Sequence, residues 1–157
     1  MSFLSLSTDL VTQAYPDQPL AVAESATVGE VVGLMKVQRG SCVLICGAGE
    51  CDGRISGIFT ERDALRWMAD GGSPHTSIRE VMTREPEALE AASTVAAAIE
   101  TMAQGGYRHL PIVDGQRRPI GVAAVRGIVH YLVDHFPQTI YNLPPEPGKT
   151  YAAREGA

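Results

Sequence analysis

The chain lacks several features that mark membrane, secreted and nucleic-acid-binding proteins. No apolar run in its 157 residues reaches the ~18 residues that a membrane-spanning helix needs. The formal charge of −5 comes from 13 basic and 18 acidic residues, and no cluster of lysine or arginine is present. This pattern argues against nucleic acid or an anionic membrane as the main partner. The N-terminus has no basic region of a secretory signal, so we expect a cytoplasmic protein.

Cysteine is scarce, and its three residues fit neither a disulfide framework nor a zinc site. Cys42 and Cys46 fall in one predicted strand, where four residues separate them by roughly 13 Å. Ligands at ~2.3 Å from one zinc ion cannot lie that far apart. We therefore expect Cys42 and Cys46 to be buried thiols and Cys51, in a glycine-rich loop, to be exposed. The histidines show no metal-ligand spacing, so we predict no metal site.

What the chain does contain is an internal repeat, with copies of about 60 residues each. Matching pairs at an offset of 67 residues are Pro19 and Pro86, Thr27 and Thr94, and Ile45 and Ile112. A loop shorter by three residues then reduces the offset to 64, which pairs Gly57 with Gly121 and Arg62 with Arg126. Such a duplication predicts two similar units that stack on each other.

Each copy reads as strand, helix, strand, strand and helix. Apolar residues at i, i+3, i+4 and i+7 predict the first helices, near residues 28–35 and 95–102. The middle strands are predicted at 41–46 and 54–59, then at 108–113 and 119–124, and the last helices at 61–70 and 126–136. One copy has too few elements to close a core. We therefore predict an α/β (α+β) fold in which two sheets face each other with pseudo-twofold symmetry, making two equivalent clefts where the copies meet.

The chain divides into four predicted segments. An N-terminal arm at residues 1–15 carries Phe3, Leu4, Leu6, Leu10 and Val11 and must pack somewhere. The first repeat spans residues 16–72 and the second spans residues 73–136. Residues 137–157 are a tail too rich in proline for regular structure.

Residues 57–66 are the strongest candidate for a ligand site. Thr60 and Asp63 lie where a predicted strand turns directly into a helix, whose unpaired N–H groups and dipole favour an anion such as a phosphate. Asp63 can accept hydrogen bonds from ribose hydroxyls, and Thr60 can donate or accept. The same Thr-x-x-Asp spacing is also a helix capping box, so both interpretations stay open.

The duplicated sequence resembles a tandem pair of CBS domains over about residues 16–136. The motifs that carry the resemblance are Gly-Ile-Phe-Thr-Glu-Arg-Asp at 57–63, Val-Met-Thr at 81–83 and Tyr-Arg-His-Leu-Pro-Ile-Val-Asp at 107–114. The resemblance implies a regulatory, non-catalytic module that forms homodimers. It also implies an adenosine-containing regulatory ligand such as AMP, ADP, ATP or S-adenosylmethionine, with no cofactor required.

The resemblance also implies roles for particular residues. In that family the Ser/Thr-x-x-Asp motif holds the ribose, which corresponds to Thr60 and Asp63. A basic pair before the middle strand often meets the phosphates, which corresponds to Arg108 and His109. The backbone around Thr83 and apolar strand residues typically enclose the base. Whether the ribose and phosphate groups, which come from different copies, share one cleft stays open.

Further candidates lie beside this motif. Ile58 is an apolar strand residue of the kind that encloses a base. Phe59 could stack on a base, although a strand aromatic usually belongs to the core. Arg62 lies in the first helical turn, where the dipole disfavours a cation. Its position indicates either a nearby anion or a surface pair with Glu61. Arg108 and His109 could equally form a solvated strand entrance.

The second copy departs from the family pattern at Ala124 and Gly127, which replace the hydroxyl and the carboxylate. A ribose there would lose both side-chain partners, and a hydrogen bond to a charged acceptor is worth about 1.5–3 kcal/mol. We therefore expect one ribose site, built around Asp63, in a sensor that signals in trans to an unknown partner protein. The alternative is a ligand-free structural or interaction module. The sequence shows no nucleophile–base pair, metal cluster or phosphate-binding loop that would indicate an enzyme.

Overall fold

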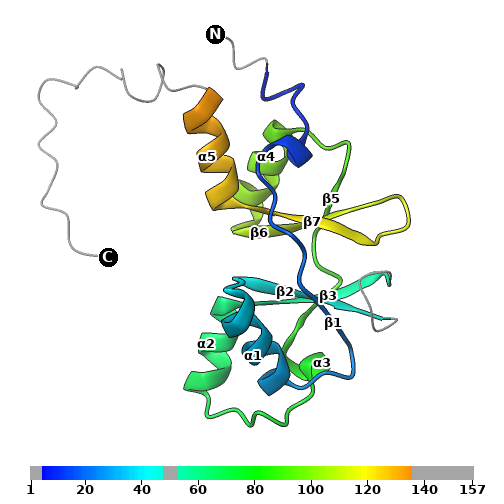
Figure 1. Ribbon diagram of the computed structural model, residues 1–157, viewed down its shortest axis with the longest axis vertical. Coiled ribbons are helices and arrows are strands. Elements are labelled where there is room, and N and C mark those ends of the chain that lie inside the picture. The colour runs from blue at the N-terminus through cyan, green and yellow to red at the C-terminus, as the bar shows by residue number, and fades with distance from the viewer. Residues whose placement is uncertain (1–4, 48–52, 136–157) are drawn as a thin grey trace, which may run out of the picture.

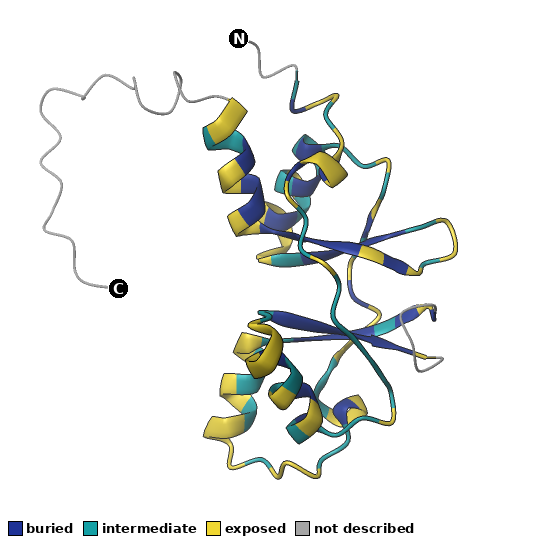
Figure 2. Ribbon diagram, viewed as in Figure 1, coloured by how far each residue is buried: buried dark blue, intermediate teal, exposed yellow. Residues whose placement is uncertain are grey.

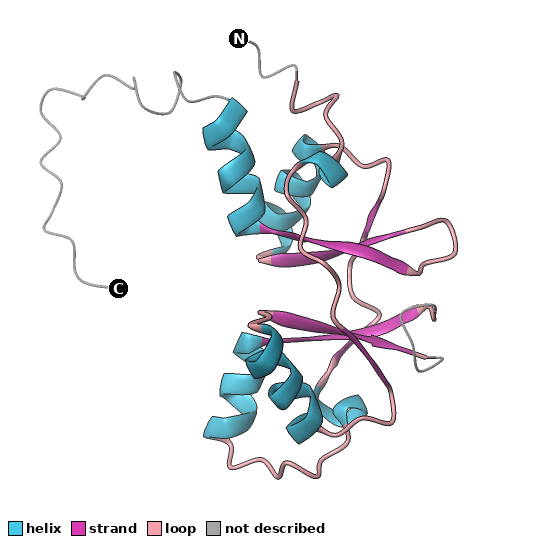
Figure 3. Cartoon of the chain, viewed as in Figure 1, coloured by secondary structure: helices cyan, strands magenta, loops and turns pink. Residues whose placement is uncertain are grey.

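Two β-sheets face each other at the centre of the molecule, and helices cover the outer face of each sheet (Figure 3). This computed structural model describes residues 5–47 and 53–135. The predictions for Cys51, for the start of the arm and for the proline-rich tail fall outside these residues. We call the half built on the four-stranded sheet lobe 1 and the half built on the three-stranded sheet lobe 2.

Lobe 1 has the strand order β1-β2-β3-β4, in which β1 runs parallel to β2 and the other pairs are antiparallel. The strands are β1 (Ala21–Ala23), β2 (Cys42–Cys46), β3 (Ile55–Thr60) and β4 (Thr83–Arg84). The helices are α1 (Val28–Gln38), α2 (Glu61–Ala69) and α3 (Ile78–Val81). They pack below the sheet in the orientation of Figure 1.

Lobe 2 repeats this arrangement with β5 (Leu89–Glu90), β6 (His109–Val113), β7 (Pro119–Ala124), α4 (Val95–Gly105) and α5 (Val125–His135). The pair β2 and β3 in lobe 1 has the same register as the pair β6 and β7 in lobe 2, with Cys42 opposite Thr60 and His109 opposite Ala124. The ladder is irregular after Ile45 in lobe 1 and after Ile112, its repeat partner, in lobe 2. The predicted α/β fold of two β-α-β-β-α repeats is thereby confirmed.

The two sheets share a buried apolar layer, as predicted from the inability of one copy to close a core. Figure 2 shows the facing strands as buried on both sides of this layer. Its buried members are Cys42, Leu44, Ile55, Ile58, Val113 and Val122. Cys42 and Cys46 are both buried thiols, which confirms that prediction. No helix within residues 5–47 and 53–135 is long and apolar enough to cross a bilayer.

The short helical segment that precedes each repeat packs on the lobe formed by the other repeat. Residues 5–17, which we call the strap, run along lobe 2 and include the 3₁₀ helix η1 (Val11–Gln13) (Figure 1). Val11 of the strap is buried in the core of lobe 2. Ile78 of α3, which the offset of 67 relates to Val11, is buried in the core of lobe 1. Two isolated bridges mark the equivalent crossings, Leu10 with Thr94 and Thr27 with Ser77.

Candidate functional site

A cleft of about 540 Å³, which we call cleft 2, opens beside the start of α2. Its walls come from the β3–α2 junction and β4 of lobe 1, from residues 85–87, and from residues 106–110 at the start of β6 in lobe 2. The lining residues are Ile58, Thr60, Glu61, Arg62, Asp63, Arg66, Thr83, Arg84, Glu85, Pro86, Glu87, Gly106, Tyr107, Arg108, His109 and Leu110.

Seven of the eight site residues predicted from the sequence line cleft 2. They are Ile58, Thr60, Arg62, Asp63, Thr83, Arg108 and His109. The sequence could not decide whether the ribose candidates of one copy and the phosphate candidates of the other would converge. The docking of the lobes brings both sets to one cleft.

Thr60 and Asp63 form the capping box that starts α2. The backbone N–H of Thr60 donates to Oδ2 of Asp63 over 2.9 Å, and the Thr60 hydroxyl donates to the same oxygen over 3.0 Å. In return, the backbone N–H of Asp63 donates to Oγ1 of Thr60 over 3.4 Å. The cap uses one carboxylate oxygen, while Oδ1 makes no hydrogen bond to any residue in the described part of the chain.

Phe59 is the predicted site residue that lies elsewhere. Its side chain is fully buried in the core between the sheet and the helices of lobe 1, where it packs in one cluster with Val28 and Val31. Side chains alternate between the two faces of a strand. Because Ile58 and Thr60 line the cleft, Phe59 between them faces the helices. Phe59 is therefore a core residue and does not line cleft 2.

Most basic side chains of cleft 2 make no ion pair with the described residues. Within residues 5–47 and 53–135, Arg62, Arg66 and Arg108 make no ion pair, so the alternative pair of Arg62 with Glu61 does not form. Nε2 of His109 lies 2.8 Å from Oγ of Ser41 in lobe 1. Burial lowers the pKa of His109 below its ordinary value. His109 is therefore held in its neutral form near pH 7.

Sequence reasoning missed several cleft residues. Arg66 lies one turn after Arg62 on α2, and this helical spacing was a usable signal. Arg84 and Glu85 enter the cleft because β4 pairs with β3, and a strand of two residues gives no readable pattern in a sequence. Tyr107 lines the cleft next to Arg108, and its place in the family motif was its only signal in the sequence.

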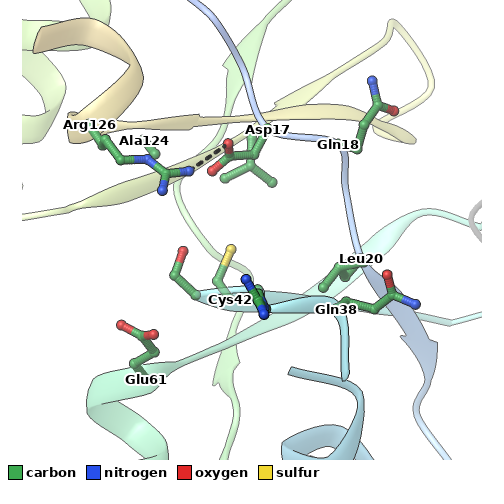
Figure 4. Close-up of a pocket in the computed structure, with 12 residues that line it drawn as sticks. Asp17, Gln18, Leu20, Gln38, Cys42, Glu61, Ala124 and Arg126 are labelled. Atoms are coloured by element: carbon green, nitrogen blue, oxygen red, sulfur yellow. Dashed lines mark hydrogen bonds and ion pairs between the residues drawn. The ribbon is translucent and has the colours of Figure 1, made fainter. Parts of the chain in front are cut away.

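The pseudo-symmetric counterpart, cleft 1, has a volume of about 550 Å³ (Figure 4). It is lined by Asp17, Gln18, Leu20, Gln38, Arg39, Gly40, Ser41, Cys42, Glu61, Val122, Ala124 and Arg126. Arg126, the repeat partner of Arg62, pairs with Asp17 of the strap at 3.4 Å. Burial, and then the charges of Asp17 and Glu61, raise the pKa of the Cys42 thiol to about 12.

The described part of the chain contains no group of three or more histidine, cysteine, aspartate or glutamate side chains arranged to hold a metal ion. Both clefts instead combine charged and hydroxyl side chains with an apolar sheet surface. Such surroundings suit an organic ligand with polar groups.

The CBS domain family model matches the sequence twice, at residues 9–70 and 78–134. The chain therefore belongs to the CBS domain family. It is 36% identical over 97 residues to the CBS domain-containing protein CBSCBSPB2 of Arabidopsis thaliana, which covers 60% of this chain and 18% of that relative. It is 32% identical over 109 residues to YhcV of Bacillus subtilis, with coverage of 69% and 74%. The chain thus spans less than a fifth of the plant relative's length.

Solved structures share the same architecture. A CBS domain protein from Pyrobaculum aerophilum, solved with AMP, superposes with a TM-score of 0.69 at 21% identity and covers 80% of this chain and 98% of its own. The CBS domain pair of protein MJ0100, solved with 5′-methylthioadenosine and S-adenosyl-L-methionine, gives a TM-score of 0.73 at 20% identity, with coverage of 82% and 98%. At these identities the likeness establishes the fold.

Proposed function

We propose that this chain is a regulatory module that binds an adenosine-containing ligand in cleft 2 and signals its presence to a partner protein. The observation that carries the proposal is the convergence of Thr60, Asp63 and Arg108 in one cleft between the lobes. The complexes of two structural neighbours, one with AMP and one with 5′-methylthioadenosine and S-adenosyl-L-methionine, support this ligand class. The proposal contains no catalytic step.

Asp63 and Thr60 are the proposed ribose contacts. Oδ2 of Asp63 holds the N–H and the hydroxyl of Thr60, whereas Oδ1 has no partner among the described residues. A carboxylate oxygen has room for two acceptor bonds, so a ribose hydroxyl can be bound through Oδ1 without opening the helix cap. The cap and the ligand site are then compatible roles of the same carboxylate.

Arg108 and His109 are the proposed phosphate contacts, with Arg62 beside them on α2. Charge-assisted hydrogen bonds from guanidinium to phosphate are among the stronger polar contacts in proteins. The N-terminus of α2 also directs its dipole at an anion in this cleft. Ile58, whose side chain is apolar, and Thr83 on β4 are the proposed neighbours of the base.

The proposed assembly is a homodimer through α2 and α5, which lie along one side of the module (Figure 1). These helices expose Leu65 (67%), Met68 (60%), Val125 (41%) and Val129 (48%). A face with four large exposed apolar side chains on two helices is typical of an interaction surface. Binding in cleft 2 at the start of α2 would be transmitted to this face through the helix.

The test is a thermal-unfolding panel with AMP, ADP, ATP, S-adenosylmethionine and GTP. A ligand at a hundred times its dissociation constant stabilises by about 2.7 kcal/mol, which is a midpoint shift of roughly 5–10 °C. We expect such a shift with an adenosine ligand and its loss in Asp63→Ala.

Glu30→Ala is the matched control. Glu30 closes the same type of capping box with Thr27 at the start of α1 and lines neither cleft. Both variants should lose about 0.5–2 kcal/mol, the range for a helix cap. Only Asp63→Ala should lose the ligand shift. No shift with any ligand, in a wild-type chain that unfolds cooperatively, would favour the ligand-free interaction module instead.

A further inference from the structure

Gly127 on α5 lies unusually close to the backbone of the strap. A Cβ atom added to Gly127 would lie 2.6 Å from the carbonyl oxygen of Tyr15 and 3.0 Å from that of Ala14. The glycine does not have a positive φ. Glycine is therefore required here for space and not for its backbone conformation. Gly127 occupies the repeat position that Asp63 holds in lobe 1, so the strap lies where a ribose-binding carboxylate would project.

The strap is fixed on the N-terminal side of this contact. Val11 is 1% exposed in the core of lobe 2, and its backbone N–H donates to the carbonyl of Ser93 over 2.8 Å. The hydroxyl of the buried Tyr131 on α5 donates to the carboxylate of Asp9. Movement of the strap away from Gly127 would disrupt these buried contacts.

The strap is also fixed at the contact and beyond it. The hydroxyl of Tyr15 donates to Oδ2 of Asp134 over 2.8 Å, although φ of Tyr15 is +50°, a region that non-glycine residues seldom adopt. Asp17 exchanges two backbone hydrogen bonds with Val122 on β7, of 2.9 and 3.0 Å. A side chain at position 127 would have to displace a segment that is held at both ends.

The strap also forms an ion pair with Arg126, one of the two arginines that line cleft 1, the other being Arg39. Figure 4 shows the Asp17 carboxylate turned toward Arg126 on the lobe 2 wall of the cleft. Arg62, the repeat partner of Arg126 in lobe 1, makes no ion pair to any residue in the described ranges. The negative charge of Asp17 lies close enough to Cys42 to help raise the pKa of that thiol. Cleft 1 is thus less favourable for a phosphate as well as for a ribose.

We propose that the strap is the specificity determinant that excludes nucleosides from cleft 1, through the contact of the Ala14 and Tyr15 carbonyls with Gly127. This inference rests on the proposed function of cleft 2. Each chain then binds one adenosine ligand, although the fold provides two clefts of nearly equal volume. Restoring the missing side chains at positions 124 and 127 would not create a second site, because the carboxylate at 127 has no room.

The binding test is isothermal titration of the full chain with AMP, and with S-adenosylmethionine as a second probe. We expect one site per wild-type chain and none in Asp63→Ala. Two sites in the wild type, or one remaining site in Asp63→Ala, would overturn the inference while leaving nucleoside binding by the module intact. Binding of neither probe by the wild type would contradict the proposed function, and this inference with it.

The packing test needs no ligand and uses two helical glycines. Gly127→Ala in α5 should lower the unfolding midpoint by several degrees, because its Cβ meets the strap backbone. Gly33→Ala in α1 is the matched control, since nothing lies within 4 Å of its added Cβ. Alanine favours helix at both positions, so the control should be unchanged or more stable. A Gly127→Ala variant as stable as the control would show that the strap does not occupy this position, and would overturn the inference.

Discussion

Ser41 and His109 are joined by a hydrogen bond of 2.8 Å although they are 68 residues apart. Ser41 lines cleft 1 and His109 lines cleft 2, so this bond lies in the wall that separates the two clefts. A ligand in either cleft would therefore lie beside one partner of this hydrogen bond between the lobes.

Stability should depend on pH through His109. Burial lowers the pKa of His109, and the groups that modify this effect are Glu61 and Asp17, which raise it, and Arg108 and Arg126, which lower it. The unfolded chain binds the proton near pH 6.5, whereas the folded chain binds it only at lower pH. The unfolded state therefore holds more protons in this window, and stability falls as pH drops below about 6.5.

Urea unfolding at pH 7.5 and 5.5 measures this linkage. The free energy of unfolding should decrease more in the wild type than in His109→Gln, which cannot titrate. Equal pH dependence of the two proteins would show that His109 is not held in its neutral form by the fold.

The homodimer face can be tested on α2. Leu65→Asp and Met68→Asp place charges at side chains that are 67% and 60% exposed, so the monomer should remain folded. If these residues pack against a second copy, the buried charges should dissociate the dimer. Sedimentation equilibrium should then give a dimer for the wild type and a monomer for the variants. Val37→Asp on α1, where Val37 is 77% exposed, is the control and should leave the mass unchanged.

Cys42 should react slowly despite lining a cleft. Its thiol pKa is raised to about 12 by burial and by the nearby carboxylates of Asp17 and Glu61. Alkylation requires the thiolate. Peptide mapping after iodoacetamide treatment at pH 8 should find the Cys42 peptide unmodified in the folded chain and modified in denaturant. Rapid labelling of the native protein would indicate that cleft 1 opens in solution.

The strap should contribute to the core of lobe 2. Val11→Ala removes two buried methyl-sized groups, which should cost roughly 1.5–3 kcal/mol including the cavity. The exposed Val37→Ala provides the reference and should change stability by less than about 0.5 kcal/mol. Chemical denaturation of the two variants compares them directly. Equal midpoints would mean that the strap is only loosely attached.

The repeat and its helices and strands could be predicted because their signals are local. Apolar spacing identified Val28, Val31, Val32 and Met35 as one helical face; Val28, Val31 and Met35 are buried and Val32 is partly buried. The alternation of side chains along a strand also predicts that Phe59 faces away from Thr60, as the structure shows. Phe59 was nevertheless a site candidate because it directly precedes Thr60 of the motif.

The convergence of the site could not be predicted, because it depends on how the lobes dock. Asp63 and Arg108 come from different copies, and nothing in their spacing fixes their separation in space. The packing of the strap on lobe 2 could have been predicted from the repeat. The offset of 67 relates Val11 to Ile78, but Pro16 and Pro19 made the repeat appear to begin later. The division into an arm at 1–15 and repeats at 16–72 and 73–136 stays a prediction.

The exchange of first segments between the lobes has a consequence for how this chain reaches its fold. Lobe 1 takes β4 from residues 83–84, so it cannot be completed until residues beyond the first repeat have left the ribosome. Lobe 2 buries Val11 and Tyr131, which are far apart in the sequence, in one apolar cluster. Contacts of such sequence separation form slowly. The strap, which lies far before the rest of lobe 2 in the sequence, is thus among the last segments to be buried. A chain cut between the repeats would leave two fragments that can complete their cores only by assembling with each other.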